Sequence, residues 1–317
     1  MPSDGSVHDD DPFDLLLIER GGYRAVEDDE RAAAKQKSRT TMIVLKNLQI
    51  ASRTDIGLVR QGNEDNLYVV PTDHAAIEKE GVLVGVADGM GGHNAGEVAS
   101  QIAVETLATY YDTVAEGVTE EQRLAKTIQK ANERILDRSN ENLDCQGLGT
   151  TLTSLLVKGE QAIIGHVGDC RIYLCRKGRL TQITMDHSLV QEAVREGILT
   201  PEQARVHPQR NIITRALGTQ EDLEVDTLTL TTRPGDLFFV SSDGLHGLLE
   251  DFEMEDLIHQ AKGEVDQVTD ALVEAALDQG GTDNITIVVV RIPGGDPLDT
   301  STPEGDLPES LLETTLP

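Results

Sequence analysis

Four aspartates stand at the ends of apolar runs that are typical of β-strands, and this placement could build a metal site. Asp88, Asp169 and Asp243 each end or interrupt such a run, and Asp283 immediately precedes another. A single aspartate in this position is typical of a turn or a cap. If the strands are sheet neighbours, however, the four carboxylates converge, and clustered carboxylates repel one another unless a cation lies between them.

The residue types favour a hard divalent cation. No Cys or His cluster accompanies the four aspartates, and sites made of oxygen ligands suit Mg²⁺ or Mn²⁺ better than Zn²⁺. Two such ions about 3.5 to 4 Å apart are the usual device for activating water against a phosphate ester. The pattern therefore predicts a metal-dependent hydrolase of phosphate esters.

The glycine-rich segment after Asp88 has other possible explanations. Asp88-Gly89 is a favoured hairpin pair, but the residues that follow have a helical rather than a strand pattern. A phosphate-binding loop needs Gly-Lys-Ser/Thr after its glycines, and this segment has no Lys. The dinucleotide-binding spacing also fails, because Asn94 stands in place of the third glycine. A metal ligand at a strand end fits the segment better than any of these.

A charged segment near residue 60 could complete such a site. Arg60 could bind phosphate oxygens through its planar guanidinium. Glu64 and Asp65 could add metal ligands or hold metal-bound water. By itself the segment is equally typical of a charged surface loop, with Arg60 as a cap.

The overall charge excludes several classes of partner. Asp and Glu number 56 against 27 Lys and Arg, which gives a formal net charge of -29 at pH 7. Nucleic acids and anionic membranes require a basic face, so we expect the chain to bind neither. Much of the acidity has a plainer explanation, since excess charge keeps a protein soluble.

The cysteines and the apolar segments indicate the compartment. Cys145, Cys170 and Cys175 have no regular spacing, which argues against a disulfide framework and favours a reducing cytosol. No signal peptide is apparent, and no apolar stretch approaches the roughly 20 residues of a membrane span. We therefore expect a soluble cytoplasmic protein. If Cys170 and Cys175 share a strand, their odd separation places them on opposite faces.

The composition divides the chain into a central domain and two tails. Residues 1–47 and 293–317 are acidic and are expected to be disordered, whereas residues 48–292 carry the apolar periodicity of one domain. The apolar residues 15–18 could instead form a docking peptide within the first tail. Met42 is an alternative start codon.

The elements expected within the domain are short strands and longer helices. Consecutive strands separated from runs of helix predict an α+β domain, with antiparallel sheets covered by helices. The expected strands are 67–70, 82–87, 152–157, 161–167, 171–176, 237–241 and 285–291. The expected helices are 96–114, 121–140, 250–261 and 265–278.

Six motifs in this order resemble the bacterial branch of the PP2C-type (PPM) protein phosphatases, over about residues 48–292. They are Asn63-Glu64-Asp65, Asp88-Gly89-Met90-Gly91-Gly92-His93, Gly149-Thr150-Thr151, Gly168-Asp169-Cys170-Arg171, Ser242-Asp243-Gly244 and Asp283-Asn284. Six ordered motifs make the resemblance highly specific. It implies a four-layer α-β-β-α sandwich with two mostly antiparallel sheets flanked by helices.

The resemblance also implies a ligand set for two Mn²⁺ or Mg²⁺ ions per chain. Asp88 would bridge the two ions, the Gly89 carbonyl would contact one, and Asp243 and Asp283 would hold the other. Further roles follow by the same resemblance: Asp65 as a ligand, Glu64 and Asn284 as supports of ligands and bound water, Asp169 with Asp243 at a weaker third cation site, and Arg60 as the phosphate-binding arginine.

Residues 186–217 would form a mobile flap beside this site. The segment fits two short helices, 188–197 and 201–205. His187, His207 and Arg215 are candidate substrate contacts in the flap, and His93 is a further candidate near the metals. An ordinary helical insertion without a catalytic role explains the segment equally well.

Three residues depart from the family pattern. Met90 stands where animal members have a His proposed as the general acid, so the resemblance assigns no general acid here. Cys170 replaces a Ser that many members have. Gly247 stands where animal members have an Asp, a change that could weaken the third cation site.

The function implied is hydrolysis of phosphoserine and phosphothreonine by in-line attack of a metal-bridging hydroxide, without a covalent intermediate. The expected partners are phosphorylated proteins and, by analogy, a Ser/Thr kinase that the enzyme opposes, and the expected state is a monomer. A catalytically inactive scaffold with the same fold is the alternative, marked by loss of ligand aspartates. An acidic Ca²⁺-binding module is a third reading, but no EF-hand loop is present.

Overall fold

Twelve strands of the described chain form two antiparallel sheets. The computed structural model describes residues 39–91, 95–112, 117–141 and 148–300. The first sheet has the order β1-β2-β12-β11-β8-β9, and the second has the order β10-β7-β6-β4-β3 with β5 paired to the end of β4. Every pairing between these strands is antiparallel, as the sequence predicts.

The bounds of the strands follow the apolar runs of the sequence. The first sheet contains β1 (Thr41–Leu45), β2 (Leu48–Asp55), β12 (Ile285–Arg291), β11 (Leu237–Ser241), β8 (Arg171–Arg176) and β9 (Arg179–Gln182). The second contains β10 (Asp226–Thr231), β7 (Gln161–Val167), β6 (Leu152–Lys158), β4 (Val82–Met90), β3 (Asp65–Val69) and β5 (Gly149–Thr150).

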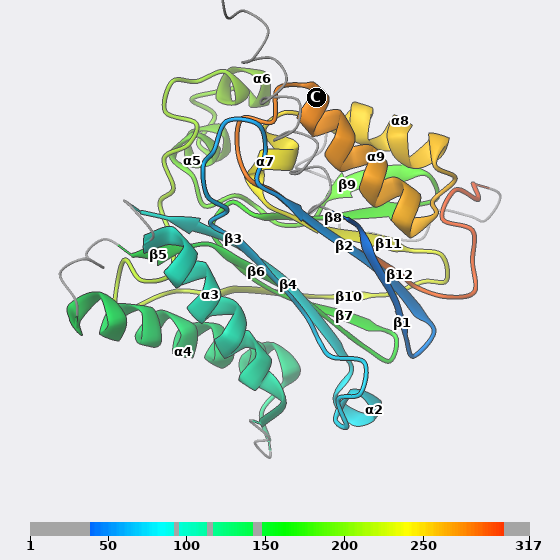
Figure 1. Ribbon diagram of the computed structural model, residues 1–317, viewed down its shortest axis with the longest axis horizontal. Coiled ribbons are helices and arrows are strands. Elements are labelled where there is room, and N and C mark those ends of the chain that lie inside the picture. The colour runs from blue at the N-terminus through cyan, green and yellow to red at the C-terminus, as the bar shows by residue number, and fades with distance from the viewer. Residues whose placement is uncertain (1–38, 92–94, 113–116, 142–147, 301–317) are drawn as a thin grey trace, which may run out of the picture. The chain divides into compact units, whose positions relative to one another are not determined.

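Helices cover the outer face of each sheet and give four layers (Figure 1). On the second sheet lie α3 (Ala95–Ala108), which continues into the 3₁₀ helix η1 (Thr109–Asp112), and α4 (Glu120–Glu141). On the first sheet lie α8 (Asp251–Gln260) and α9 (Val265–Asp278). The remaining helices are short: α2 (Ile77–Glu80), α5 (Leu189–Arg195), α6 (Pro201–Arg205) and α7 (Asp243–His246). None of the helices in the described residues combines the length and apolar character needed to cross a membrane.

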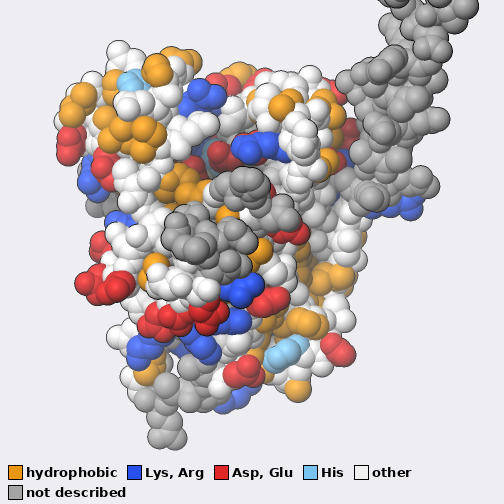
Figure 2. Space-filling model, turned by 60° about the vertical axis from the view of Figure 1, so that its left-hand side comes forward, with side chains coloured by type: hydrophobic (Ala, Val, Ile, Leu, Met, Phe, Trp, Pro, Cys, Tyr) orange, Lys and Arg blue, Asp and Glu red, His pale blue; other side chains and the backbone are white. Residues whose placement is uncertain are grey.

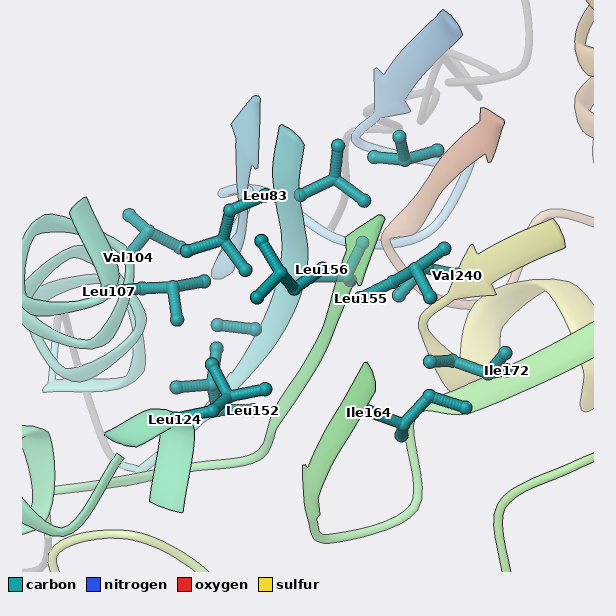
Figure 3. Close-up of a cluster of buried hydrophobic side chains, with 14 of the residues drawn as sticks. Leu83, Val104, Leu107, Leu124, Leu152, Leu155, Leu156, Ile164, Ile172 and Val240 are labelled. Carbon is teal, nitrogen blue, oxygen red and sulfur yellow. The ribbon is translucent and has the colours of Figure 1, made fainter. Parts of the chain in front are cut away.

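The core lies between these layers and is mainly aliphatic. Leu83, Leu155 and Leu156 of the second sheet lie between Leu107 and Leu124 of the covering helices and side chains of the first sheet (Figure 3). A second cluster fills the space between the first sheet and α8 and α9. Cys170 and Cys175 belong to different clusters, but Cys170 lies just before β8 and so does not share a strand with Cys175.

Both predicted domain boundaries need correction. The tail expected over residues 1–47 contains β1, which pairs with β2 through a turn in which Lys46 and Asn47 have positive φ values of 49° and 69°. Such a two-residue hairpin turn favours Asn and Gly, and the expectation overlooked it because the strand is only five residues long. Residues 1–38 lie outside the described chain.

The C-terminal boundary is also later than expected. Gly178 N donates to Pro297 O at 2.8 Å, and Leu298 packs on the second cluster. The segment after Arg291 therefore continues the domain across β9 and α8, although its composition is that of a tail. The expected disorder of residues 301–317 falls outside the described residues.

Candidate metal centre

Two of the predicted ligands face each other across adjacent strands. Asp65 begins β3 and is paired directly opposite Asp88 of β4. Like charges directly opposite on neighbouring strands destabilise a sheet, and Asp65 is only 5% exposed. The register thus holds two carboxyl groups together where water cannot fully solvate them.

The Gly149-Thr150-Thr151 motif fixes the backbone of Asp88. Asp88 N donates to Thr151 Oγ1 at 3.0 Å. Asp88 O accepts from Thr150 Oγ1 at 2.8 Å and from Thr151 N at 2.9 Å. Both threonines are completely buried. The motif was recognised in the sequence, but its role in holding the central aspartate appears only in three dimensions.

Gly89 is held at a crossing where no side chain fits. A Cβ at Gly89 would lie 2.1 Å from Gly96 O, so only glycine allows the start of α3 to approach β4 this closely. Gly89 N donates to Glu64 O at 3.2 Å, and Ser100 Oγ of α3 donates to the same carbonyl. The backbone around Asp88 is therefore rigidly tied to β3 and α3.

Two further carboxylates come from the first sheet. Asp243 is the first residue of α7, directly after β11, and Asp283 lies just before β12. Since β11 and β12 are neighbours, these two side chains lie at the same edge. Ser242 Oγ donates to Asp65 Oδ2 at 2.7 Å, so the two sheets meet at this point.

The carboxyl groups perturb one another strongly. Burial raises the pKa of Asp65 to about 7, partly offset by hydrogen bonds from Ser242 and Thr286. Burial, together with the nearby Asp283, raises the pKa of Asp243 to about 6. For Asp88, burial is the largest cause, and the charges of Asp65, Asp243, Asp169 and Asp283 raise its pKa further. All five predicted aspartates therefore share one electrostatic environment.

Asp169 brings a free acceptor to this environment. It follows β7 and is 8% exposed, and its Oδ1 atom is buried without a hydrogen-bond partner among the described residues. Burial and the charge of Asp243 raise the pKa of Asp169 well above its ordinary value. An unpartnered buried carboxylate oxygen is costly, and a cation would satisfy it.

The described residues do not form a closed metal cage as they stand. No three of their His, Cys, Asp and Glu side chains are arranged closely enough to hold an ion. Arg60 Nη2 donates to Asp283 Oδ2 at 2.7 Å, so one predicted ligand is engaged by a predicted phosphate contact. The chemistry of the donors nevertheless fits hard cations, because four aspartates with raised pKa values lie together with an orphaned carboxylate oxygen.

Asn284 supports the loop that carries Arg60 and Glu64. It is 4% exposed, its Oδ1 accepts from Glu64 N at 2.8 Å, and its Nδ2 donates to Ile56 O and Gly62 O at 2.9 and 3.0 Å. All of its amide groups are therefore used within the protein. Asn284 therefore holds the loop in place, and its expected role in supporting metal ligands stays a prediction.

The flap helices occur where the sequence predicts them. Ser188 caps α5 by accepting from Gln191 N, and Thr200 with Gln203 forms a capping box at α6. Arg205 Nε lies 2.9 Å from Glu250 Oε1, an ion pair that ties α6 to the residue before α8. Figure 2 shows acidic and basic side chains together in a hollow of the molecular surface, bordered by hydrophobic ones.

The candidate substrate contacts in the flap do not meet at the carboxylates. His187 is 7% exposed and is bonded internally. Arg215 forms ion pairs with Asp226 and Glu224. His207 Nδ1 accepts from Gln209 N in a local turn. His187 and Arg215 thus have partners within the protein, their contact with a substrate stays a prediction, and His93 lies outside the described residues.

Sequence reasoning missed a partly buried ion pair between the Gly-Asp-Cys-Arg motif and the first residue of the flap. Arg171 of the Gly-Asp-Cys-Arg motif donates to Asp186 through Nε at 2.8 Å and Nη2 at 2.7 Å. Tyr173 Oη accepts from Arg171 Nη1 at 2.8 Å. The only available signal was the motif itself, because Asp186 is distant from it in the chain and carries no pattern of its own.

A pocket of about 450 Å³ lies away from this centre. It is lined by residues of α4 and of the 221–224 segment, and none of the predicted ligands belongs to it. Its volume says nothing about the chemistry at the carboxylates. The electrostatic coupling and the burial of the aspartates identify the candidate site instead.

The fold and the carboxylate cluster define a metal-dependent phosphatase of the α-β-β-α class, and known proteins agree. The sequence profile described as protein phosphatase 2C matches residues 61–284. The chain belongs to this family. Serine/threonine phosphatase stp of Listeria innocua is 38% identical over 242 residues, which are 75% of this chain and 94% of that protein. PstP of Mycobacterium tuberculosis is 40% identical over 245 residues, 77% of this chain and 45% of that protein.

Solved structures show the same fold. The crystal structure of the Mycobacterium tuberculosis serine/threonine phosphatase PstP/Ppp has a TM-score of 0.69 and 39% sequence identity, covering 78% of this chain and 99% of that one. The catalytic domain of PstP in complex with two manganese ions has a TM-score of 0.67 and 38% identity over 78% of this chain and 99% of that one. Stp1 of Staphylococcus aureus has a TM-score of 0.72 and 33% identity, over 80% and 98%.

Proposed function

We propose that this phosphatase hydrolyses phosphoserine and phosphothreonine on proteins, with two Mn²⁺ or Mg²⁺ ions at the carboxylate cluster. The observation that carries the proposal is the shared environment of Asp65, Asp88, Asp169, Asp243 and Asp283. Burial and mutual repulsion raise the pKa values of the first four of these aspartates. A group of acids that repel each other inside a protein is stabilised by cations. The serine/threonine specificity of the relatives supports the substrate class.

The positions of the side chains support the ligand roles that we propose. Asp88 is central, since it faces Asp65 across the β3–β4 pair and the charges of the other three raise its pKa, so it would be a ligand of both ions. We assign Asp243, Asp283 and Asp65 to the same two ions, the Gly89 carbonyl to one of them, and Asp169 with Asp243 to a weaker third. When bound, such ions acidify water for in-line attack on phosphorus and neutralise the charge of the phosphoryl group.

The protein's own residues bind and orient the phosphate. Arg60 is half exposed at the rim and presents a planar fork with two donors. Asn284 fixes the loop that carries Arg60, and Thr150 with Thr151 fixes Asp88. Such preorganised groups are what a reaction needs when it depends on position and charge rather than on a protein nucleophile.

The proposal extends to the partners and the compartment. Phosphorylated proteins are the substrates, a Ser/Thr kinase supplies them, and the chain acts as a monomer in signal transduction in the cytoplasm. Cys170 and Cys175 are buried free thiols, which suits a reducing compartment. No nucleic acid is expected, because the net charge is -29.

Hydrolysis measured with and without cations tests the proposal. A phosphothreonine peptide and para-nitrophenyl phosphate should both be turned over with Mn²⁺, and EDTA should abolish turnover. Full activity after exhaustive chelation would rule out the metal centre. An inactive scaffold gives the opposite result: Mn²⁺ binds in calorimetry, but neither substrate is hydrolysed at any concentration of metal.

A further inference from the structure

His187 uses its polar atoms to join three segments of the chain. Its backbone N–H donates to Gly168 O and its carbonyl accepts from Thr214 N, each at 2.8 Å. Its ring Nδ1 accepts from Gly168 N at 3.0 Å, and its Nε2 lies 3.1 Å from Asp226 Oδ2. The residue is 7% exposed. His187 therefore connects parts of the protein and does not project towards a substrate.

The partners of the ring select one tautomer. The backbone N–H of Gly168 can only donate, so Nδ1 must be unprotonated and the ring proton lies on Nε2. That N–H donates to Asp226, and this hydrogen bond is the largest cause that lowers the pKa of Asp226 to about 2. Arg215 Nη1 also lies 3.1 Å from Nε2, but a guanidinium nitrogen cannot accept the proton that Nε2 carries. Nη1 therefore donates to Asp226 instead. The ring is fixed in both orientation and tautomer.

Gly168 is confined on its other side by Thr151. It has a φ of 109°, and a Cβ there would lie 2.4 Å from Thr151 Cγ2. Only glycine adopts this conformation in this space. Thr151 in turn holds Asp88 through its Oγ1 atom. The turn that aims Asp169 into the cluster is thus held between His187 and the support of Asp88.

The same histidine lies at the base of the flap. Residues 187 and 214 are hydrogen-bonded, Ser188 forms an isolated β-bridge with Ile213, and Leu189 N donates to Ile212 O at 2.9 Å. The start of the 186–217 segment is therefore paired with residues 212–214 near its end, and this paired base contacts Gly168 through His187. His166 is buried and packs against the ring of His187 in a tilted arrangement, with a centroid distance of 4.7 Å.

We propose that His187 is a positioning residue that holds the Gly168–Asp169 turn and couples the closed base of the flap to the carboxylate of the third cation site. The inference rests on the metal centre proposed above. If the two are coupled, displacement of the flap base weakens cation binding at Asp169, and cation binding there stabilises the flap base by the same free energy.

Three substitutions of His187 separate its two ring contacts. His187→Leu removes both, His187→Asn keeps an acceptor at the place of Nδ1, and His187→Gln keeps a donor near the place of Nε2. His74→Leu is the matched control, because His74 Nδ1 also accepts a backbone N–H, from Ala76, and its ring also stacks on an aromatic ring, that of Tyr111. His74 lies in the β3–β4 connection, outside the proposed site.

Two measurements are made on each full-length variant. Calorimetric titration with Mn²⁺ gives the number and affinity of cation sites, and NMR gives the exchange rate of the Gly168 amide. We expect His187→Leu to weaken the weakest Mn²⁺ site by about tenfold or more, in the range seen for residues that support metal ligands, and to accelerate Gly168 exchange. His187→Asn should restore most of both, and His74→Leu should match the wild type.

A folded His187→Leu protein with the wild-type Mn²⁺ isotherm and wild-type Gly168 exchange overturns the proposal. If His187→Leu does not fold, the comparison of His187→Asn with His187→Gln decides, and equal behaviour of these two overturns it. Failure of the proposed function is distinguishable: a wild-type chain that binds no Mn²⁺ contradicts the metal centre, whereas Gly168 exchange still reports whether His187 holds the turn.

Discussion

Arg60 and Asp283 are 223 residues apart in the chain and form an ion pair of 2.7 Å at the edge of the carboxylate cluster. One was expected to bind phosphate and the other to bind a cation. Asp283 Oδ2 can accept from the guanidinium or coordinate an ion, and the hydrogen bond to Asp283 is the largest cause that raises the pKa of Arg60. In the proposed site, cation binding at Asp283 would compete with this pair and release Arg60 towards phosphate.

Substitution of Arg60 should affect substrate binding more than the chemical step. Arg60→Ala is expected to raise KM for a phosphopeptide with a smaller decrease in kcat, because Arg60 in its proposed role would bind phosphate oxygens in both the ground state and the transition state. Arg60→Lys keeps the charge but loses the fork, so it should restore KM only in part. Steady-state kinetics at saturating Mn²⁺ measure both parameters.

The control for Arg60 is Arg179→Ala, which removes an exposed arginine on β9. It should leave KM and kcat unchanged. If Arg60→Ala also leaves KM unchanged for both the phosphopeptide and para-nitrophenyl phosphate, and alters only the melting temperature, then Arg60 is merely part of a surface loop.

Replacing the central aspartate should separate activity from stability. Asp88→Asn is expected to reduce kcat by about a thousandfold or more, since loss of a bridging anionic ligand removes several kcal/mol of transition-state stabilisation. The melting temperature in EDTA should not fall, because the change relieves the repulsion with Asp65 on the opposite strand. Kinetics with Mn²⁺ and calorimetric melts in EDTA test the two parts, with Asp73→Asn in an exposed loop as control.

A kcat of Asp88→Asn close to that of the wild type would remove Asp88 from the bridging position. A large drop in melting temperature would show instead that the carboxylate of Asp88 stabilises the fold, which the repulsive environment argues against.

Truncation should show where the domain begins and ends. A protein of residues 39–300 is expected to melt like the full chain and to keep its activity. Deletion of residues 1–47 removes β1, including buried Leu45, and uncovers the edge of β2. Loss of that one buried side chain costs about 1.5 to 3 kcal/mol, so the melting temperature should fall by several degrees. Equal melting curves for the two truncations would place β1 outside the stable domain.

The buried ion pair between Glu80 and Arg123 should make part of the stability depend on pH. Burial alone raises the pKa of Glu80, but the hydrogen bonds from Arg123 and Lys79 outweigh it and lower the pKa to about 2. A carboxyl group with a lowered folded pKa stabilises the protein above its unfolded pKa, and this contribution is lost as pH falls towards the folded value. The window runs from about pH 4.5 down to about pH 2.

Urea denaturation of the wild type and of Glu80→Gln across this window measures the contribution. The difference in unfolding free energy should be largest at neutral pH and should shrink as pH falls from 4.5 towards 2. A difference that stays constant over the whole range would mean that the charge of Glu80 does not stabilise the fold. Glu78→Gln, a substitution on the same short helix at an exposed position, is the control.

Much of the fold could be predicted because its strands are long apolar runs. The runs 152–157, 161–167 and 285–291 coincide with β6, β7 and β12 to within one residue. By contrast, β10 (Asp226–Thr231) alternates Thr and Leu and is largely polar, and β1 and β9 are short edge strands. Their pairing is decided by neighbours distant in the sequence, so local pattern alone does not reveal them.

The acidic residues of the candidate site could be predicted, but the residues that support them could not. The aspartates lie at or near strand ends, where an apolar run stops, and this position is visible in the sequence, although β4 continues two residues beyond Asp88. The supports are different: the pairing of Asp186 with Arg171 and the contact of His187 with Gly168 depend on the path of the flap. The residue type alone does not show whether a histidine is exposed. His187 was therefore a candidate substrate contact, although the structure shows that it is buried.

The division of the ligands between the two sheets has a consequence for fragments of this chain. Asp65, Asp88 and Asp169 come from the part before the flap, and Asp243 and Asp283 come from the part after it. A cut at the exposed Ile198, between α5 and α6, therefore leaves neither piece with the full set. Recovery of phosphatase activity on mixing the two pieces would measure their reassociation, which makes the chain a candidate for a split reporter.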